Sequence, residues 1–115
     1  MRRVVVTGMG MVSPLGCGVE HVWRRIINGE SGIRGIQSFD VSDLPCKIAG
    51  EVPRGERANG NFDAAAYILP KDQRKMDAFI HYAIAATAEA VAKSISRIGA
   101  TTKLWKRFER HPHEA

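Results

Sequence analysis

Residues 2–16 read Arg2-Arg3-Val4-Val5-Val6-Thr7-Gly8-Met9-Gly10-Met11-Val12-Ser13-Pro14-Leu15-Gly16. The three consecutive valines are β-branched and predict a short strand. Gly8 and Gly10 directly after them predict a tight turn, and an apolar helical pattern begins near Val19. A strand, a glycine-rich turn and a helix form the opening unit of many α/β folds, so these residues predict the α/β class.

An amphipathic helix is predicted from residue 19. Its apolar residues recur at helical spacing and form one stripe: Val19, Val22, Trp23, Ile26 and Ile27. Arg24 and Arg25 fall outside the stripe, and Gly29 is placed to end the helix. We expect Trp23 to pack in the core.

The middle of the chain predicts one more strand between two loops. Residues 30–40 predict a loop, whereas residues 46–52 alternate weakly and predict a strand that Pro53 ends. Residues 54–61 are polar and contain glycine, which is typical of a mobile loop.

A second helix is predicted from Pro70 to Ala92. Proline in the first turn, with Asp72 close behind it, is a standard start signal. From Phe79 onward this helix is apolar nearly all the way round, with six alanines between residues 83 and 92. Such a helix must be covered on more than one side, and its small side chains allow another element to approach closely.

The composition is that of a soluble globular protein with room for one domain. The chain has 115 residues, of which 44% are hydrophobic and 25% are charged. It holds no run of eighteen apolar residues, so we predict no transmembrane helix and a cytoplasmic location. The net charge is +5, but residues 1–92 hold eleven basic and ten acidic residues, against six and two in residues 93–115. The chain therefore has two parts of different character.

The sequence offers no complete metal, nucleotide or nucleophile motif. Cys17 and Cys46 lack CxxC spacing and are interpreted as packing residues. His21 and His81 lie on predicted helices with no cysteine or carboxylate at i+3 or i+4. Residues 8–13 fall one glycine short of the GxGxxG fingerprint and lack the acidic residue that ends its second strand. We predict no metal site, no cofactor and no catalytic residue.

Three cations stand at the start of the second predicted helix. Lys71, Arg74 and Lys75 have i, i+3 and i+4 spacing, so on a helix they share one exposed face. Cations near a helix N-terminus oppose its macrodipole. The pattern fits a solvated helix start or a surface for an acidic partner.

The wording of two segments resembles the β-ketoacyl-acyl-carrier-protein synthases of type II, the condensing enzymes of fatty acid synthesis. One segment is residues 2–16, and the other reads Lys71-Asp72-Gln73-Arg74-Lys75-Met76-Asp77-Ala78-Phe79. The resemblance covers roughly residues 2–92, with Trp23 and Gly29 at the expected places between the two segments. It implies a thiolase-like fold of two related α/β halves and a homodimeric parent. This chain would hold only the first β-α-β-α portion of that fold.

The resemblance also implies a partner. In the family, basic residues of the second segment help to dock the acidic acyl carrier protein. They correspond here to Lys71, Arg74 and Lys75.

The family's catalytic residues are not expected in this chain. Its reaction is a decarboxylative Claisen condensation that uses a cysteine nucleophile, two histidines and a supporting lysine, all well beyond the first hundred positions. The cysteines and helical histidines of this chain match none of those motifs. The resemblance therefore implies that the chain alone lacks condensing activity.

We expect an incomplete synthase domain in residues 1–92 and a basic tail foreign to the family in residues 93–115. The abrupt change near residue 93 indicates a frameshift or a truncation. Two alternatives are kept. One is a non-catalytic module that binds acyl carrier protein through the cationic helix face. The other, less favoured, is a nucleic-acid binder that uses the basic tail with Trp105 and Phe108.

Overall fold

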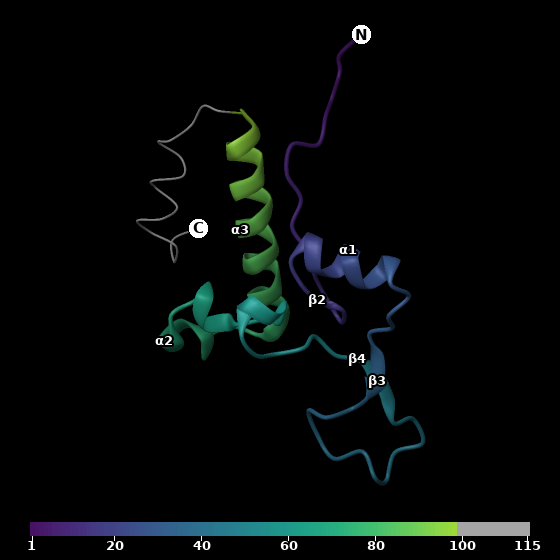
Figure 1. Cartoon of the computed structure of the whole chain (residues 1–115). Helices are drawn as coiled ribbons and strands as arrows, with labels where there is room; N and C mark the ends of the chain where they lie inside the picture. Colours follow the sequence, from purple (N-terminus) through teal and green to yellow (C-terminus); the bar gives the residue numbers. More distant parts are fainter. Residues whose placement is uncertain (99–115) are drawn as a thin grey trace. The chain divides into compact units, whose positions relative to one another are not determined.

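The computed structural model describes residues 1–98 of the chain, in two compact units. One unit joins Met1–Met11 to the segment that begins at Asp63, and the other is Val12–Phe62. Along the chain, two strands precede the first helix, two more strands follow it, and the remaining elements are helical (Figure 1). The α/β class predicted from the sequence is confirmed at this level. Of the basic tail considered for nucleic-acid binding, residues 99–115 lie outside the described residues.

Two antiparallel strand pairs form the sheets of the unit Val12–Phe62. β1 (Val12–Ser13) pairs with β2 (Gly16–Cys17), and β3 (Ile33–Gly35) pairs with β4 (Ile48–Gly50). β4 confirms the strand predicted within residues 46–52. β3 corrects the prediction that residues 30–40 form a loop. Its short sequence carries no alternation, and pairing with β4 makes it a strand.

The turn between β1 and β2 depends on glycine at residue 16. Its φ is 141°, a region that side chains disfavour. A Cβ there would also stand 2.5 Å from the carbonyl oxygen of Gly60. The same carbonyl accepts a hydrogen bond of 2.8 Å from the backbone N–H of Cys17. This bond ties the hairpin to residues 54–62 of the same unit.

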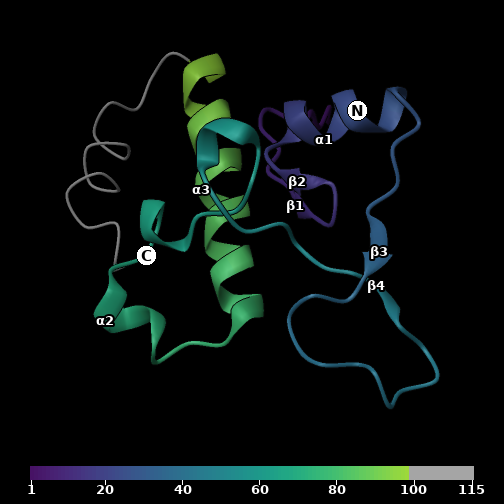
Figure 2. The ribbon, with the colours of Figure 1, turned by 60° about the horizontal axis from the view of Figure 1, so that its bottom comes forward.

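Helix α1 (Val19–Ile27) has the predicted bounds, and Gly29 follows its C-cap with a φ of 71°. Figure 2 shows the helix beside β2, on which it packs. Val22 is buried at 2% exposure, but Trp23 is 61% exposed. The prediction that Trp23 packs in the core is therefore wrong. The described strand pair is too small to cover the whole apolar stripe, so its outer part faces solvent.

The segment predicted as a mobile polar loop contains regular structure. Residues 57–59 form the 3-10 helix η1 (Arg57–Asn59), and Phe62 pairs with Arg54 in an isolated bridge. The Phe62 side chain is 1% exposed, with the Arg54 guanidinium 6.0 Å from its ring centroid. The buried ring of Phe62 thus anchors the end of this loop.

Residues 1–11 run as an extended segment that is not a strand. Within the described residues, no backbone hydrogen bond joins residues 1–6 to another segment. The strand predicted at residues 4–6 is therefore absent from the described structure. β-branched residues favour the extended conformation, but a strand also needs a hydrogen-bonded neighbour. Without one, the three valines stay exposed.

Gly8 and Gly10 lie against helix α3 (Ala78–Ile98) and do not form the predicted tight turn. A Cβ at Gly8 would stand 2.1 Å from the carbonyl oxygen of Ala90. On either side of the glycines, the hydroxyls of Thr7 and Ser94 bond at 2.8 Å, and the Met11 N–H donates to Glu89 at 3.0 Å. The glycines allow the backbone to approach the helix closely. The alanines of α3 therefore admit a close neighbour, as predicted.

The helix predicted from Pro70 to Ala92 is two helices in the structure. A short helix, α2 (Pro70–Gln73), follows the 3-10 helix η2 (Ala64–Ala66), and α3 begins only at Ala78. The prediction of one continuous helix is wrong at this break. α3 then continues past Ala92 to Ile98.

Candidate functional site

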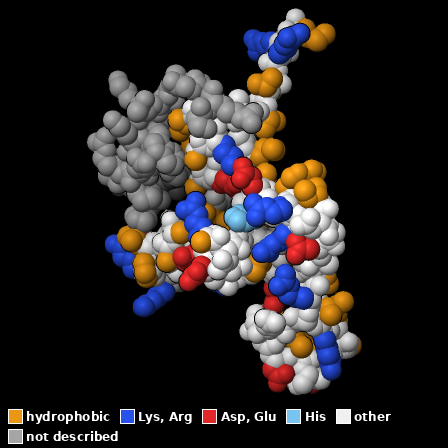
Figure 3. Space-filling model, viewed as in Figure 1, with side chains coloured by type: hydrophobic (Ala, Val, Ile, Leu, Met, Phe, Trp, Pro, Cys, Tyr) orange, Lys and Arg blue, Asp and Glu red, His pale blue; other side chains and the backbone are white. Residues whose placement is uncertain are grey.

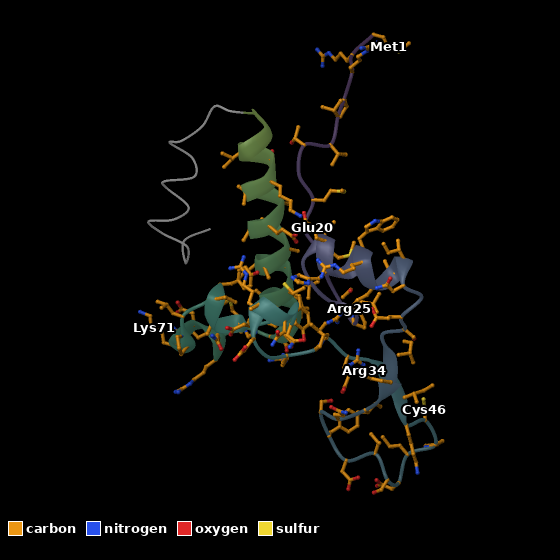
Figure 4. The ribbon with its side chains drawn as sticks, in the orientation of Figure 1. Met1, Glu20, Arg25, Arg34, Cys46 and Lys71 are labelled. Carbon is orange, nitrogen blue, oxygen red and sulfur yellow. The ribbon has the colours of Figure 1, made fainter. Side chains whose placement is uncertain are left out.

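The three predicted cations lie on a short helix and the turn that follows it, here called the basic segment (residues 71–75). Lys71 belongs to α2, Arg74 is its C-cap, and Lys75 follows. All three side chains are exposed. Lys71 projects from α2 in Figure 4, and Figure 3 shows Lys and Arg side chains on the surface there. The expected single helix face is wrong, because α2 ends at Gln73. The three cations lie partly on α2 and partly on the turn that follows it.

The cations of the basic segment are available for an external partner. Among the described residues, none of the three forms a salt bridge. The neighbouring carboxylate Asp77 accepts a hydrogen bond of 2.9 Å from the backbone N–H of Ala78 at the start of α3. On α3 itself, Lys93 is paired with Glu89 at 2.8 Å. The basic segment therefore presents positive charge that its described neighbours leave unpaired.

Gln73 lies in the middle of the basic segment and attaches it to the preceding residues. Its side-chain amide donates a hydrogen bond of 2.9 Å to the carbonyl oxygen of Ile68, a residue that is 4% exposed. Its backbone N–H donates to the Leu69 carbonyl at 3.0 Å. The segment is thus attached to the chain that precedes it.

His81 holds the same segment from the first turns of α3. Its Nε2 lies 3.2 Å from the backbone carbonyl oxygen of Gln73, and the side chain is 8% exposed. The other ring nitrogen, Nδ1, is buried without a partner among the described residues. From the sequence, His81 was considered only as a metal ligand or a catalytic residue, and this contact was not predicted. The contact forms because the chain breaks between α2 and α3. No local sequence signal predicted this break.

Neither cysteine lies in a reactive cluster. Cys17 is buried in β2, which confirms its interpretation as a packing residue. Cys46 is exposed near β4 (Figure 4), and its thiol donates to the Ile48 carbonyl at 3.4 Å. Its interpretation as a packing residue is wrong, because the β3–β4 loop is too open to bury it. The described residues contain no group of three metal-ligating side chains. They also contain no helix long and apolar enough to cross a membrane.

Two carboxylates stabilise loop backbone in the unit Val12–Phe62. Hydrogen bonds from the Ser38 hydroxyl and the Gln37 N–H lower the pKa of Glu51. The Ser42 N–H, 3.0 Å from the Asp40 carboxylate, lowers the pKa of Asp40. A lowered pKa favours the ionised form, which accepts hydrogen bonds and cannot donate a proton at neutral pH. The carboxylates of Glu51 and Asp40 therefore stabilise the loop backbone by accepting hydrogen bonds.

The chain matches a protein-family model. That family is described as "Beta-ketoacyl synthase, N-terminal domain", and the match covers residues 1–101. It spans the basic segment, both strand pairs and α3.

Several curated relatives are similar over most of this chain. A 3-oxoacyl-(acyl-carrier-protein) synthase 2 of Rhizobium meliloti is 52% identical over 80% of the chain and 22% of that protein. The enzyme of the same name from Vibrio harveyi is 46% identical over 81% of the chain and 21% of that protein. The mitochondrial 3-oxoacyl-(acyl-carrier-protein) synthase of Arabidopsis thaliana is 44% identical over 78% of the chain and 22% of that protein. The chain thus spans about a fifth of the length of these relatives.

Proposed function

Because the chain belongs to the β-ketoacyl synthase family, we propose that it is the N-terminal region of a condensing enzyme of fatty acid synthesis. The match of the family model to residues 1–101 carries this proposal. The parent has a thiolase-like fold of two α/β halves and forms a homodimer. It extends an acyl group with a malonyl group by decarboxylative Claisen condensation, both groups being delivered by acyl carrier protein.

The chain alone catalyses no condensation under this proposal. The reaction needs a thiolate nucleophile whose pKa is lowered by its surroundings, together with histidines that stabilise the developing charge. Cys17 is buried in a hairpin, and Cys46 is exposed on an open loop. Incubation with acyl and malonyl carrier proteins is expected to give no 3-oxoacyl product. Product formation above the buffer control would contradict this.

The role proposed for this chain is to bind acyl carrier protein through Lys71, Arg74 and Lys75. The exposure of all three cations, and the absence of a salt bridge to any of them within the described part of the chain, support it. Relatives at 46–52% identity carry acyl carrier protein in their names. An acidic partner gains charge complementarity and faster association from such a surface.

Charge reversal at these three positions tests the binding proposal. The variant Lys71→Glu, Arg74→Glu, Lys75→Glu is compared with Arg2→Glu, Arg3→Glu, Arg24→Glu, which changes the net charge equally at exposed arginines elsewhere. Calorimetric titration with acyl carrier protein is expected to show binding that weakens with salt. That binding is lost in the first variant and kept in the second. Equal losses in both variants would reduce the effect to net charge and overturn the proposed site.

A further inference from the structure

We propose that Gln73 and His81 are positioning residues that fix the basic segment in the conformation that its partner binds. This inference rests on the proposed binding of acyl carrier protein. Under this inference, hydrogen bonds made by two uncharged side chains set the arrangement of three charged ones.

The basic segment cannot hold its own shape. α2 comprises four residues, about one helical turn. Isolated helices of fewer than about twelve residues are marginal in water, because nucleation costs more than one turn of hydrogen bonds returns. The relative positions of Lys71, Arg74 and Lys75 therefore depend on contacts made outside α2.

Gln73 supplies such contacts in two directions. Its side-chain amide bonds backward to the buried residue Ile68, whose own N–H donates to the Ala64 carbonyl at 2.9 Å. Its backbone carbonyl bonds forward to His81. The residue between the cations is thus attached both to the chain around η2 and to α3.

The direction of the forward bond is settled by chemistry. A carbonyl oxygen only accepts hydrogen bonds, so Nε2 of His81 carries the proton and donates. Without this donor, the Gln73 carbonyl keeps only the Met76 N–H at 3.4 Å among its described partners. That is a long bond by ordinary standards. Within the turn, the Lys75 N–H donates to the Asp72 carbonyl at 3.1 Å. The side-chain attachment of this turn to α3 is the His81 imidazole.

Fixing this turn matters for binding because ordering side chains costs free energy. Each long side chain immobilised at an interface costs binding free energy, and a segment ordered beforehand avoids part of that cost. Loss of the Gln73–His81 hydrogen bond is expected to weaken binding of acyl carrier protein about tenfold. The number of charges on the basic segment is unchanged.

The matched variants are His81→Gln, which keeps a donor at similar reach, and His81→Leu, which keeps apolar volume without a donor. Amide hydrogen exchange of the free chain is expected to speed up at residues 74–77 in His81→Leu only. The same variant is expected to bind acyl carrier protein about tenfold more weakly than wild type. His81→Gln is expected to restore both values.

Salt dependence separates positioning from charge. His81→Leu is expected to weaken binding by the same factor at each salt concentration, whereas the charge-reversed variant loses the salt dependence itself. Wild-type affinity in His81→Leu, or no rescue by His81→Gln, would overturn the inference. Gln73→Met, which removes the donor to Ile68, provides a second test with the same expected outcome if His81→Leu does not fold.

The hydrogen-exchange measurement needs no partner. If wild type fails to bind acyl carrier protein, the proposed function fails. Faster exchange at residues 74–77 in His81→Leu would still establish that His81 orders the segment. Unchanged exchange in that variant would overturn the positioning role whatever the binding result.

Discussion

The backbone of Gly10 lies directly against the carbonyl group of Ala86. A Cβ at residue 10 would stand 1.7 Å from the Ala86 oxygen, a distance that no real contact shows. Gly8 meets Ala90 in the same way, one helical turn further along α3. Two extended residues span about 6.6 Å, and four helical residues rise about 6.0 Å, so the glycine spacing matches the alanine spacing. The Gly-x-Gly sequence is thus a packing motif.

Substitution Gly10→Ala is expected to destabilise the unit that contains α3. The added methyl group must displace either the extended segment or the helix backbone, and overpacking of this kind costs about 1–3 kcal/mol. Urea unfolding followed by far-ultraviolet circular dichroism measures the change. Gly35→Ala is the control, because the nearest atom to a Cβ there is the Lys47 carbonyl oxygen at 4.0 Å. Equal stability of the two variants would contradict the packing role of Gly10.

Arg25→Leu is expected to destabilise the unit Val12–Phe62 by about 1.5–3 kcal/mol, the range for a hydrogen bond to a charged group. The Arg25 guanidinium donates to the Leu15 carbonyl in the β1–β2 turn and, at 3.5 Å, to the Asn59 carbonyl. Arg24→Leu removes the same charge from the same helix at an exposed position. Thermal unfolding of both variants provides the measurement. A similar loss in Arg24→Leu would assign the effect to helix charge.

The β3–β4 loop is expected to loosen in acid. Because its hydrogen bonds hold the folded-state pKa of Glu51 below the ordinary value of about 4.3, the contribution of Glu51 to stability is complete above that value. It is lost as the pH falls through the folded-state pKa. Amide chemical shifts of Gln37 and Ser38 should follow this titration. They should not do so in Glu51→Gln, whereas Glu30→Gln should titrate like wild type. Identical titrations in Glu51→Gln and wild type would exclude Glu51 as the cause.

The exposed valines near the N-terminus are expected to drive self-association. Val4, Val5 and Val6 are 93%, 75% and 72% exposed, and their backbone is unpaired within residues 1–98. An apolar segment of this kind is a template for pairing with another chain. Val5→Lys is expected to raise the monomer fraction in sedimentation velocity. Ala83→Lys, which adds the same charge at an exposed position on α3, is expected to leave it unchanged. A monomeric wild type would contradict this prediction.

Local patterns predicted the elements whose signals are local. The apolar stripe and Gly29 gave the bounds of α1, because periodicity and an end signal lie within a few residues of each other. The same stripe led to the wrong prediction that Trp23 is buried. Its burial depends on which other segments cover α1, and the described strand pair covers only the side near Val22.

Predictions failed where structure depends on distant partners. The valines at residues 4–6 have strong strand propensity, but pairing decides whether a strand forms. β3 formed at a segment with weak propensity because β4 pairs with it. The break between α2 and α3 allows the Gln73–His81 contact, which side-chain spacing on an assumed continuous helix could not reveal.

The candidate site was also predictable only in part from the sequence. Charge is readable in the sequence, so Lys71, Arg74 and Lys75 were identifiable as exposed cations. Their arrangement was not, because α2 ends at Gln73 and the backbone carbonyl of that residue bonds to His81 across the helix break. A glutamine between cations and a histidine eight positions later are a weak sequence signal on their own.

The contact between Thr7 and Ser94 has a consequence for synthesis of the chain. The two residues are 87 positions apart, and a ribosome adds about 5–20 residues per second. The valines therefore leave the ribosome roughly four seconds or more before the helix that receives the glycines after them. Meanwhile all residues of the unit Val12–Phe62 have already been made. In the cell, Thr7 and the glycines after it are therefore secured only after α3 has been made, and until then this segment stays exposed to chaperones and proteases.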